Sequence, residues 1–256
     1  MAKYIDTHVH FYDEWFGQDY RDEIGRSLSA GVEIMVQPDV DSSERDRMFA
    51  ISEEYPGTLY TMLGLYPGSV NEDWEKEIEA LDDWWDKGPV AIGEIGLDYH
   101  YGKETAELQK LAFACQLRMA ASRDLPVNIH LREATEDFFK VLDSCPALPP
   151  RGCLHAFSGT AETFRRLQKY GEWYVGIGGV LTFKNSRLPE AVAAIPIERI
   201  LLETDSPYLA PVPFRGQRNS SANIPVIAEA LARIKGIDIE QVAEVTTANA
   251  TKFFNL

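Results

Sequence analysis

Short apolar segments alternate with longer amphipathic segments along almost the whole chain. The apolar segments are rich in β-branched and aromatic residues and too short for a helical period, so each is predicted to be a strand. The predicted strands cover residues 4–11, 32–36, 59–65, 90–97, 126–131, 152–157, 173–180 and 199–204.

The segments between these strands have helical character. Predicted helices cover residues 22–30, 42–54, 72–87, 103–122 and 161–170, with one that ends near 144, a short one after 188, and two more at 224–235 and 239–253. In the segment 72–87, Trp74, Ile78, Leu81 and Trp85 repeat at helical spacing, which is typical of contacts with a core.

Apolar strands that alternate with helices indicate a parallel sheet covered by helices. Eight such units in 256 residues predict a closed (β/α)8 barrel, the TIM-barrel class, as one domain over residues 1–256. The alternative is an open, doubly wound sheet. It lacks support because no glycine-rich dinucleotide fingerprint follows the first strand.

Composition limits the possible classes of protein. The chain is 45% hydrophobic and 25% charged, with no apolar run near the ~20 residues of a membrane span. No signal peptide precedes the first strand, and Cys115, Cys145 and Cys153 lack paired or metal-binding spacing, so we expect a cytoplasmic protein with reduced thiols. The net charge of −15 argues against coating of duplex DNA, although divalent ions can reverse the field in an acidic cleft.

Barrel enzymes carry their chemistry at the C-terminal ends of the strands. The candidates there are His8 and His10 on the first strand, Glu94 on the fourth, His130 on the fifth, His155 on the sixth, and Glu203 with Asp205 on the eighth. Side chains alternate along a strand, so His8 and His10 share a face, and so does Asp6. Any one of these histidines alone could be an ordinary core residue, but four of the chain's five fall on predicted strands.

Six ligand candidates suit two divalent ions (Zn, Mn or Mg) better than one. The expected division gives the first ion His8, His10, Glu94 and Asp205, and the second ion Glu94, His130 and His155, with Glu94 as the bridge. Asp205 is also expected to take a proton from the attacking water; the alternative is that it caps a helix before Pro207. Glu203 is expected to support ligands from behind, and Asp98 either to orient a ligand or to cap the next helix.

Five segments together resemble the TatD family of metal-dependent deoxyribonucleases, over essentially the whole chain. They are Ile5-Asp6-Thr7-His8-Val9-His10, Gly93-Glu94-Ile95-Gly96-Leu97-Asp98-Tyr99, His130-Leu131-Arg132, His155-Ala156-Phe157-Ser158-Gly159 and Glu203-Thr204-Asp205-Ser206-Pro207-Tyr208-Leu209. The resemblance implies a barrel of the amidohydrolase superfamily, a two-metal site and hydrolysis of DNA phosphodiester bonds, often from an end. It places the family's ligands on the same six residues.

The chain departs from the family pattern in two places. Where the family often has Gly-x-His-Pro-His, this chain has Gly64-Leu65-Tyr66-Pro67-Gly68, so both histidines are replaced. A later block keeps Arg215 and Arg218 but lacks the acidic residue that follows them in the family. We therefore expect the rate of hydrolysis and the substrate preference to be the properties in which this chain differs from the family.

Basic residues on the loops complete the expected site. Arg132, Lys184, Arg215 and Arg218 are candidates for binding substrate phosphate, with ordinary solvated charges as the alternative. His100 could contact a base or lie in solvent. The predicted function is therefore cleavage of DNA, preferably single strands or chain ends, by a two-metal activated water. The alternatives are an enzyme that cuts an amide, lactone or aminoacyl ester, and a metal-binding protein with little catalysis.

Overall fold

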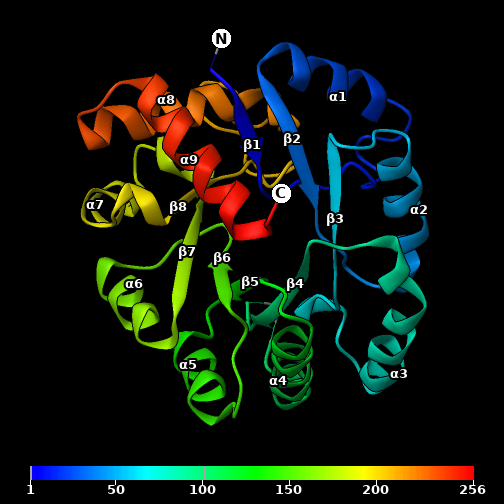
Figure 1. Cartoon of the computed structure of the whole chain (residues 1–256). Coiled ribbons are helices and arrows are strands. Elements are labelled where there is room, and N and C mark those ends of the chain that lie inside the picture. The colour runs from blue at the N-terminus through cyan, green and yellow to red at the C-terminus, as the bar shows by residue number, and fades with distance from the viewer. Residues whose placement is uncertain (1, 101) are drawn as a thin grey trace.

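The computed structural model describes residues 2–100 and 102–256, which form an eight-stranded parallel barrel (Figure 1). Each strand pairs with the next in the chain, and the barrel closes through backbone hydrogen bonds from Thr7 to Leu202 and from Asp205 to His8, both 3.0 Å long. The strands are β1 Tyr4–Asp6, β2 Val32–Gln37, β3 Leu59–Leu63, β4 Ala91–Asp98, β5 Val127–Arg132, β6 Arg151–Leu154, β7 Glu172–Ile177 and β8 Ile200–Leu202. The predicted (β/α)8 barrel is confirmed.

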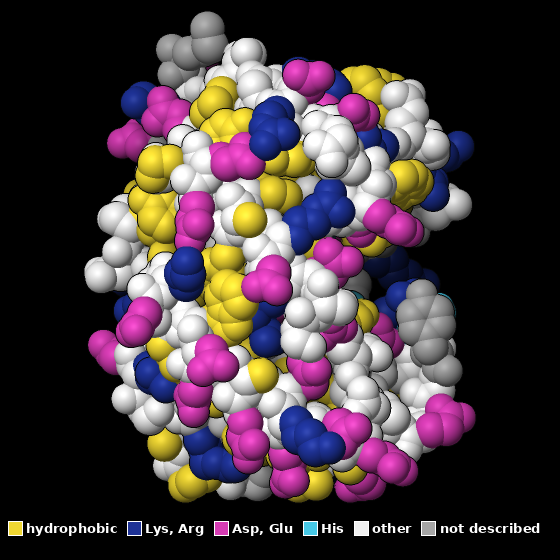
Figure 2. All heavy atoms as spheres, turned by 90° about the vertical axis from the view of Figure 1, so that its right-hand side faces the viewer, with side chains coloured by type: hydrophobic (Ala, Val, Ile, Leu, Met, Phe, Trp, Pro, Cys, Tyr) yellow, Lys and Arg dark blue, Asp and Glu magenta, His cyan; other side chains and the backbone are white. Residues whose placement is uncertain are grey.

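Helices surround the strands on the outside of the barrel (Figure 1). They are α1 Tyr20–Ser29, α2 Ser42–Glu53, α3 Trp74–Glu79, α4 Ala106–Arg123, α5 Thr135–Ser144, α6 Ala161–Leu167, α7 Leu188–Ala194, α8 Ile224–Lys235 and α9 Ile239–Phe254. No helix of the described residues is long and apolar enough to cross a membrane. Figure 2 shows acidic and basic side chains interspersed over the face that carries α2 and α3.

The buried apolar residues form two clusters. The larger one lies between the strands and the surrounding helices. The smaller one joins side chains from β1, β2, β3, β4, β6, β7 and β8 to Phe253 and Phe254 of α9. Two hydrogen bonds fix α9 against strand beginnings: Arg151, the first residue of β6, donates to the carbonyl of Phe253 at 2.9 Å, and Asn249 donates to the carbonyl of Ile200, the first residue of β8, at 2.8 Å. α9 therefore closes the N-terminal end of the barrel, and the opposite end remains for chemistry.

Several strands are shorter than the sequence predicts. β1 ends at Asp6, β6 at Leu154 and β8 at Leu202, so His8, His10, His155, Glu203 and Asp205 lie just past strand ends, and of the four predicted strand histidines only His130 lies within a strand. The backbone explains two of these ends. Ala156 and Asp205 have φ angles of 42° and 55°, in the left-handed region, which breaks the extended conformation.

The segment 72–87 is also divided differently. α3 ends at Glu79, and a 3₁₀ helix continues from Ala80 to Lys87. In a 3₁₀ helix, residues three apart share a face. This places Trp84 with the buried Leu81, and Trp84 stacks on Phe49 with ring centroids 4.8 Å apart. The predicted core contacts of this segment are therefore present. The next helix, α4, begins at Ala106, three residues later than expected.

Candidate metal centre

The six predicted ligands meet around one cavity of about 850 Å³ at the C-terminal ends of the strands. His10, Glu94, His130, His155 and Asp205 line it, and the fully buried His8 lies directly beneath. Asp6 is not part of this group, because its carboxylate accepts hydrogen bonds from the backbone and hydroxyl of Thr204. Asp6 therefore joins the segments after β1 and β8 instead of facing the cavity.

His8 and His10 are each held by a partner behind the ring. Nδ1 of His8 lies 2.9 Å from the amide oxygen of Asn128, and an amide oxygen can only accept a hydrogen bond. Nδ1 of His10 lies 2.7 Å from the hydroxyl of Tyr12, whose own proton goes to the carbonyl of Pro38 at 2.6 Å. Both Nδ1 atoms must therefore carry the proton, and both Nε2 atoms present a lone pair.

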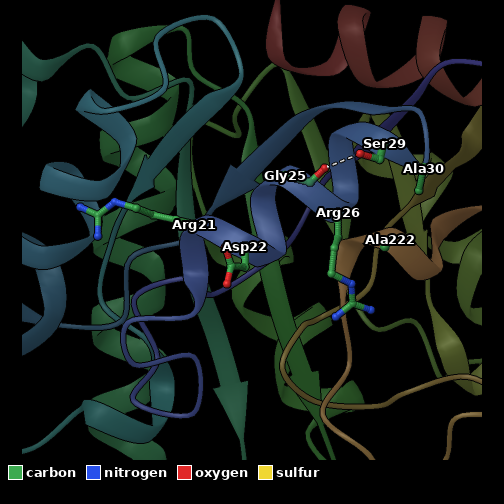
Figure 3. A pocket seen from close by; sticks show the side chains of 7 residues that line it. All are labelled: Arg21, Asp22, Gly25, Arg26, Ser29, Ala30 and Ala222. Atoms are coloured by element: carbon green, nitrogen blue, oxygen red, sulfur yellow. Dashed lines mark hydrogen bonds between the residues drawn. The ribbon is translucent and has the colours of Figure 1, made fainter.

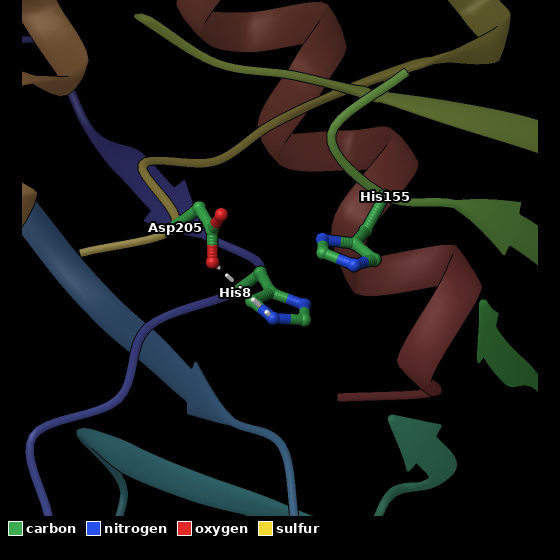
Figure 4. A group of neighbouring side chains, drawn as sticks. All are labelled: His8, His155 and Asp205. Carbon is green, nitrogen blue, oxygen red and sulfur yellow. Dashed lines mark ion pairs between the residues drawn. The ribbon is translucent and has the colours of Figure 1, made fainter. Parts of the chain in front are cut away.

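These two Nε2 atoms face each other at 3.1 Å, and two lone pairs cannot form a hydrogen bond. Oδ1 of Asp205 lies 3.3 Å from Nε2 of His10 and 3.7 Å from that of His8, and Oε2 of Glu94 lies 3.4 Å from Nε2 of His8. In Figure 4 the side chains of His8 and Asp205 point toward one another, with His155 close by. Convergent lone pairs and carboxylate oxygens are the arrangement that a divalent cation requires, so these residues fit a metal.

A second group consists of Glu94, His130 and His155, and so shares Glu94 with the first. The other oxygen of Glu94, Oε1, lies 2.8 Å from both Nδ1 of His130 and Nε2 of His155. Nε2 of His130 donates to Asp98 at 2.8 Å, which leaves Nδ1 of His130 as its ligand atom. Glu94 thus presents one oxygen to each group, which is the arrangement expected of a bridging carboxylate.

Glu203 and Asp98 lie behind the histidines. Glu203 is fully buried, accepts a hydrogen bond from the backbone of Ala156, and has an oxygen 3.9 Å from Nδ1 of His155. A side chain at Gly176 would collide with this carboxyl group, since its Cβ would come within 1.9 Å. The alternative of Asp98 as a helix cap is wrong, because α4 begins after Thr105 and Asp98 contacts His130.

The alternative helix cap at Asp205 is also wrong. The residues after Asp205 form a turn closed by a hydrogen bond from Tyr208 to the Asp205 carbonyl, and the next helical segment begins at Ser221. The Asp205 side chain is directed to His8 and His10 instead.

Burial and opposite charges shape the titration of the cluster. Burial lowers the pKa of His8 to about 4. Burial also opposes protonation of His130, but its hydrogen bonds to Asp98 and Glu94 raise its pKa to about 9. The pKa of Glu203 is raised well above its usual value by burial and by the nearby carboxylates of Asp205 and Asp6. The contacts of His130 with Glu94 and Asp98 thus favour its charged form, whereas burial favours the protonated form of Glu203 behind the histidines.

Asn128 and Tyr12 are site residues that the sequence analysis missed. Each lies two residues from a predicted ligand, Asn128 before His130 and Tyr12 after His10. Side chains two apart on a strand share a face, so this spacing is a signal for Asn128. Tyr12 lies beyond β1 in a turn, where no periodic pattern applies.

Tyr66 and Gly68 stand where the family often has two histidines, and the space for the tyrosine depends on the glycine. Tyr66 lines the cavity, its ring centroid lies 5.1 Å from that of His130, and its hydroxyl donates to Asp98 at 3.4 Å. A Cβ at Gly68 would lie 2.3 Å from the Tyr66 ring. Glycine at position 68 therefore makes the space that the tyrosine occupies.

Of the four basic candidates for phosphate binding, only Arg132 is among the described residues that line the cavity. Lys184 is exposed, and Arg215 packs over the ring of Phe183 at 4.2 Å. Arg218 donates to the carbonyl of Trp15 at 2.8 Å, so it fixes a loop at the rim. His100 pairs with Glu133 at 2.7 Å and is not among the lining residues.

A second hollow of about 660 Å³ lies on the outer surface of α1 (Figure 3). Arg21 and Arg26 project there, but each pairs with a glutamate, Arg21 with Glu54 at 2.7 Å and Arg26 with Glu23. The candidate ligands lie elsewhere, so we assign the chemistry to the barrel mouth.

A barrel whose C-terminal mouth gathers four histidines and two carboxylates defines the class of metal-dependent hydrolases. The model of the family described as "TatD related DNase" matches residues 5–255, and the chain belongs to this family. It is 38% identical to the uncharacterized metal-dependent hydrolase YabD of Bacillus subtilis, over 98% of this chain and 99% of that protein.

Two further comparisons agree. The chain is 33% identical to the 3'-5' ssDNA/RNA exonuclease TatD of Erwinia tasmaniensis, covering 98% of this chain and all of that protein. The crystal structure of YjjV, a TatD homologue from Escherichia coli, superposes with a TM-score of 0.90 at 30% identity and covers 100% of this chain and 99% of that one. The predicted family is confirmed.

Proposed function

We propose that this metal-dependent hydrolase cleaves phosphodiester bonds at the ends of single-stranded nucleic acid, DNA in the first place. The observation that carries the proposal is the pair of side-chain groups that share Glu94 and could each hold a cation, with the Nε2 atoms of His8 and His10 3.1 Å apart. Relatives named 3'-5' ssDNA/RNA exonuclease support the choice of substrate.

The chain's own residues define the roles at the mouth. His8, His10, Glu94 and Asp205 would hold one divalent ion, and Glu94, His130 and His155 the other. Bound divalent cations supply two things, a more acidic water and charge neutralisation at the phosphoryl oxygens. Asp205, Arg132 and Tyr66 all line the cavity. Asp205 would take the proton of the attacking water, and Arg132 and the hydroxyl of Tyr66 would contact the phosphate.

The cavity also favours an end over the middle of a duplex. The acidic residues Asp13, Glu14 and Glu44 line one side of it, next to the β1 loop. They repel a backbone that would continue past the site in that direction. A single chain end, with its phosphates toward Arg132 on the opposite strand β5, avoids this repulsion.

The test compares the purified protein with Asp205→Asn on single strands labelled at the 5′ or the 3′ end. We expect cleavage with Zn²⁺, Mn²⁺ or Mg²⁺, none with chelator, and at least a hundredfold loss in Asp205→Asn. Glu244→Gln, an exposed carboxylate on α9 at the other end of the barrel, serves as the control. The proposal fails if the metal-loaded protein leaves both strands intact or hydrolyses a cyclic amide instead.

A further inference from the structure

Exposed apolar side chains gather beside the metal centre. Among the described residues, six large apolar side chains are exposed, and Leu28 and Leu111 lie on the outer helices α1 and α4. The other four lie on the loops after β1 and β8: Trp15 (56% exposed), Tyr208, Leu209 and Val212. Tyr208 and Leu209 also line the cavity. Since exposed apolar surface is unfavourable in water, its concentration on these two loops points to a ligand that covers it.

Trp15 and Tyr208 form an aromatic pair that leads from solvent to the metal centre. Their ring centroids are 6.1 Å apart with planes inclined by 41°. Tyr208 lines the cavity, and its ring centroid also lies 6.1 Å from that of His10. A planar group of the substrate that contacts the aromatic pair would therefore lie next to the bond to be cleaved, if that bond is bound at the candidate metal ligands.

The backbone that carries the exposed indole is fixed on both sides. The carboxylate of Asp13 accepts hydrogen bonds from the Trp15 amide, at 2.7 Å, and from the Tyr208 hydroxyl. The guanidinium of Arg218 donates to the Trp15 carbonyl at 2.8 Å and packs 4.9 Å above the ring of the buried Phe16. An anchored loop with an exposed aromatic face needs little reorganisation when a ligand stacks on it.

The charges around the aromatic pair decide what kind of group it accepts. Asp13, Glu14 and Glu44 line the neighbouring part of the cavity, so a phosphate is disfavoured there. Arg132 is the last residue of β5, the strand opposite β1 in the eight-stranded barrel. An uncharged aromatic base beside Trp15 avoids the acidic side of the cavity, and its phosphate can then face the basic side at Arg132.

We propose that Trp15 and Tyr208 are a stacking subsite for an unpaired nucleobase of the substrate. This inference rests on the proposed function and deepens it. Because every base has a π face, the subsite tolerates any sequence. It selects single strands, since the bases of a duplex are already stacked on one another.

The kinetic test uses Trp15→Ala, Trp15→Phe and the control Leu111→Ala, which removes an equally exposed side chain from α4. The substrates are a dT oligonucleotide and an oligonucleotide of the same length with abasic sites at both ends. Trp15→Ala is expected to raise KM for the dT oligonucleotide roughly tenfold with little change in kcat, and Trp15→Phe to restore most of the loss. The abasic substrate should not distinguish the variants; equal losses on both substrates, or an unchanged KM, would overturn the inference.

A binding measurement separates this inference from the proposed function. The tryptophan emission of wild type minus that of Trp15→Phe reports on Trp15, and the ligand is a phosphorothioate dT oligonucleotide in Mg²⁺. Quenching of this difference by the dT oligonucleotide but not by its abasic counterpart supports stacking even if the protein hydrolyses no nucleic acid. Hydrolysis without such quenching sustains the function and rejects the subsite. Absence of both rejects both.

Discussion

The amide oxygen of Asn128 lies 2.9 Å from Nδ1 of His8, and this contact determines which nitrogen of His8 faces the metal centre. Asn128 is fully buried on β5, whereas His8 follows β1 on the opposite side of the barrel interior. A residue on one strand thus orients a candidate metal ligand in the loop after another strand. The same logic applies to Tyr12 and His10, and to Asp98 and His130.

Asn128→Leu removes the acceptor while keeping a similar volume. We expect a 10–100-fold loss of divalent-metal affinity, because His8 can then adopt the other tautomer and turn its ring. Titration calorimetry of the metal-free protein with Zn²⁺ measures this. Asn128→Asp keeps an oxygen acceptor at the same place and should retain most of the affinity. Equal losses in both variants would mean that Asn128 serves the packing of β5 and not the orientation of His8.

Gly68→Ala is expected to displace Tyr66, because the added Cβ would lie 2.3 Å from its ring. The predicted cost is about 1–3 kcal/mol in the free energy of unfolding, as for other overpacked sites. A double-mutant cycle with Tyr66→Ala isolates the contact. In the Tyr66→Ala background, Gly68→Ala should cost almost nothing; an unchanged cost there would place the strain elsewhere in the loop.

Arg45→Met tests a buried ion pair between α2 and the segment after β2. Nε of Arg45 donates to Asp39 at 2.7 Å, both side chains are almost fully buried, and Asp39 also accepts from the amide of Gly64 at 3.2 Å. Burial raises the pKa of Asp39 to about 7 even beside Arg45, so without the arginine Asp39 takes up a proton at neutral pH. The loss of this charged hydrogen bond costs about 1.5–3 kcal/mol. Urea unfolding measures the loss. Arg233→Met, which breaks the exposed pair with Glu229, should change stability by less than about 1 kcal/mol.

Glu172 is expected to make stability depend on pH in the acidic range. Burial raises the pKa of Glu172, but hydrogen bonds from Lys252 and Arg199, both at 2.5 Å, lower it from 4.5 to about 2. A carboxylate with a lowered pKa in the folded state stabilises above its unfolded pKa and loses this contribution as pH falls. The stability difference between wild type and Glu172→Gln should therefore be full at pH 7 and shrink between about pH 4.5 and 2. A difference that is constant over this window would contradict the assignment.

The alternation of apolar and amphipathic segments determined the barrel. Most strand residues are buried on both faces of the sheet, whereas a helix buries one face. These requirements are local, so the sequence carries them without knowledge of distant contacts. The same regularity predicted that His130 and Glu94 lie on strands, and they lie within β5 and β4. His8, His155 and Asp205 were predicted on strands as well, but each lies past a strand end, where the backbone leaves the regular pattern.

Only the tertiary structure decided how these side chains are oriented and which basic residues reach the cavity. Asn128 and His8 are 120 residues apart, and Arg218 and Trp15 are 203 apart, so neither hydrogen bond leaves a periodic signal. The sequence gives the charge of Arg218 and its place on a loop, but not the direction in which its side chain points. Direction depends on contacts between segments that meet only when the barrel closes, and closure brings together the loops after β1 and β8.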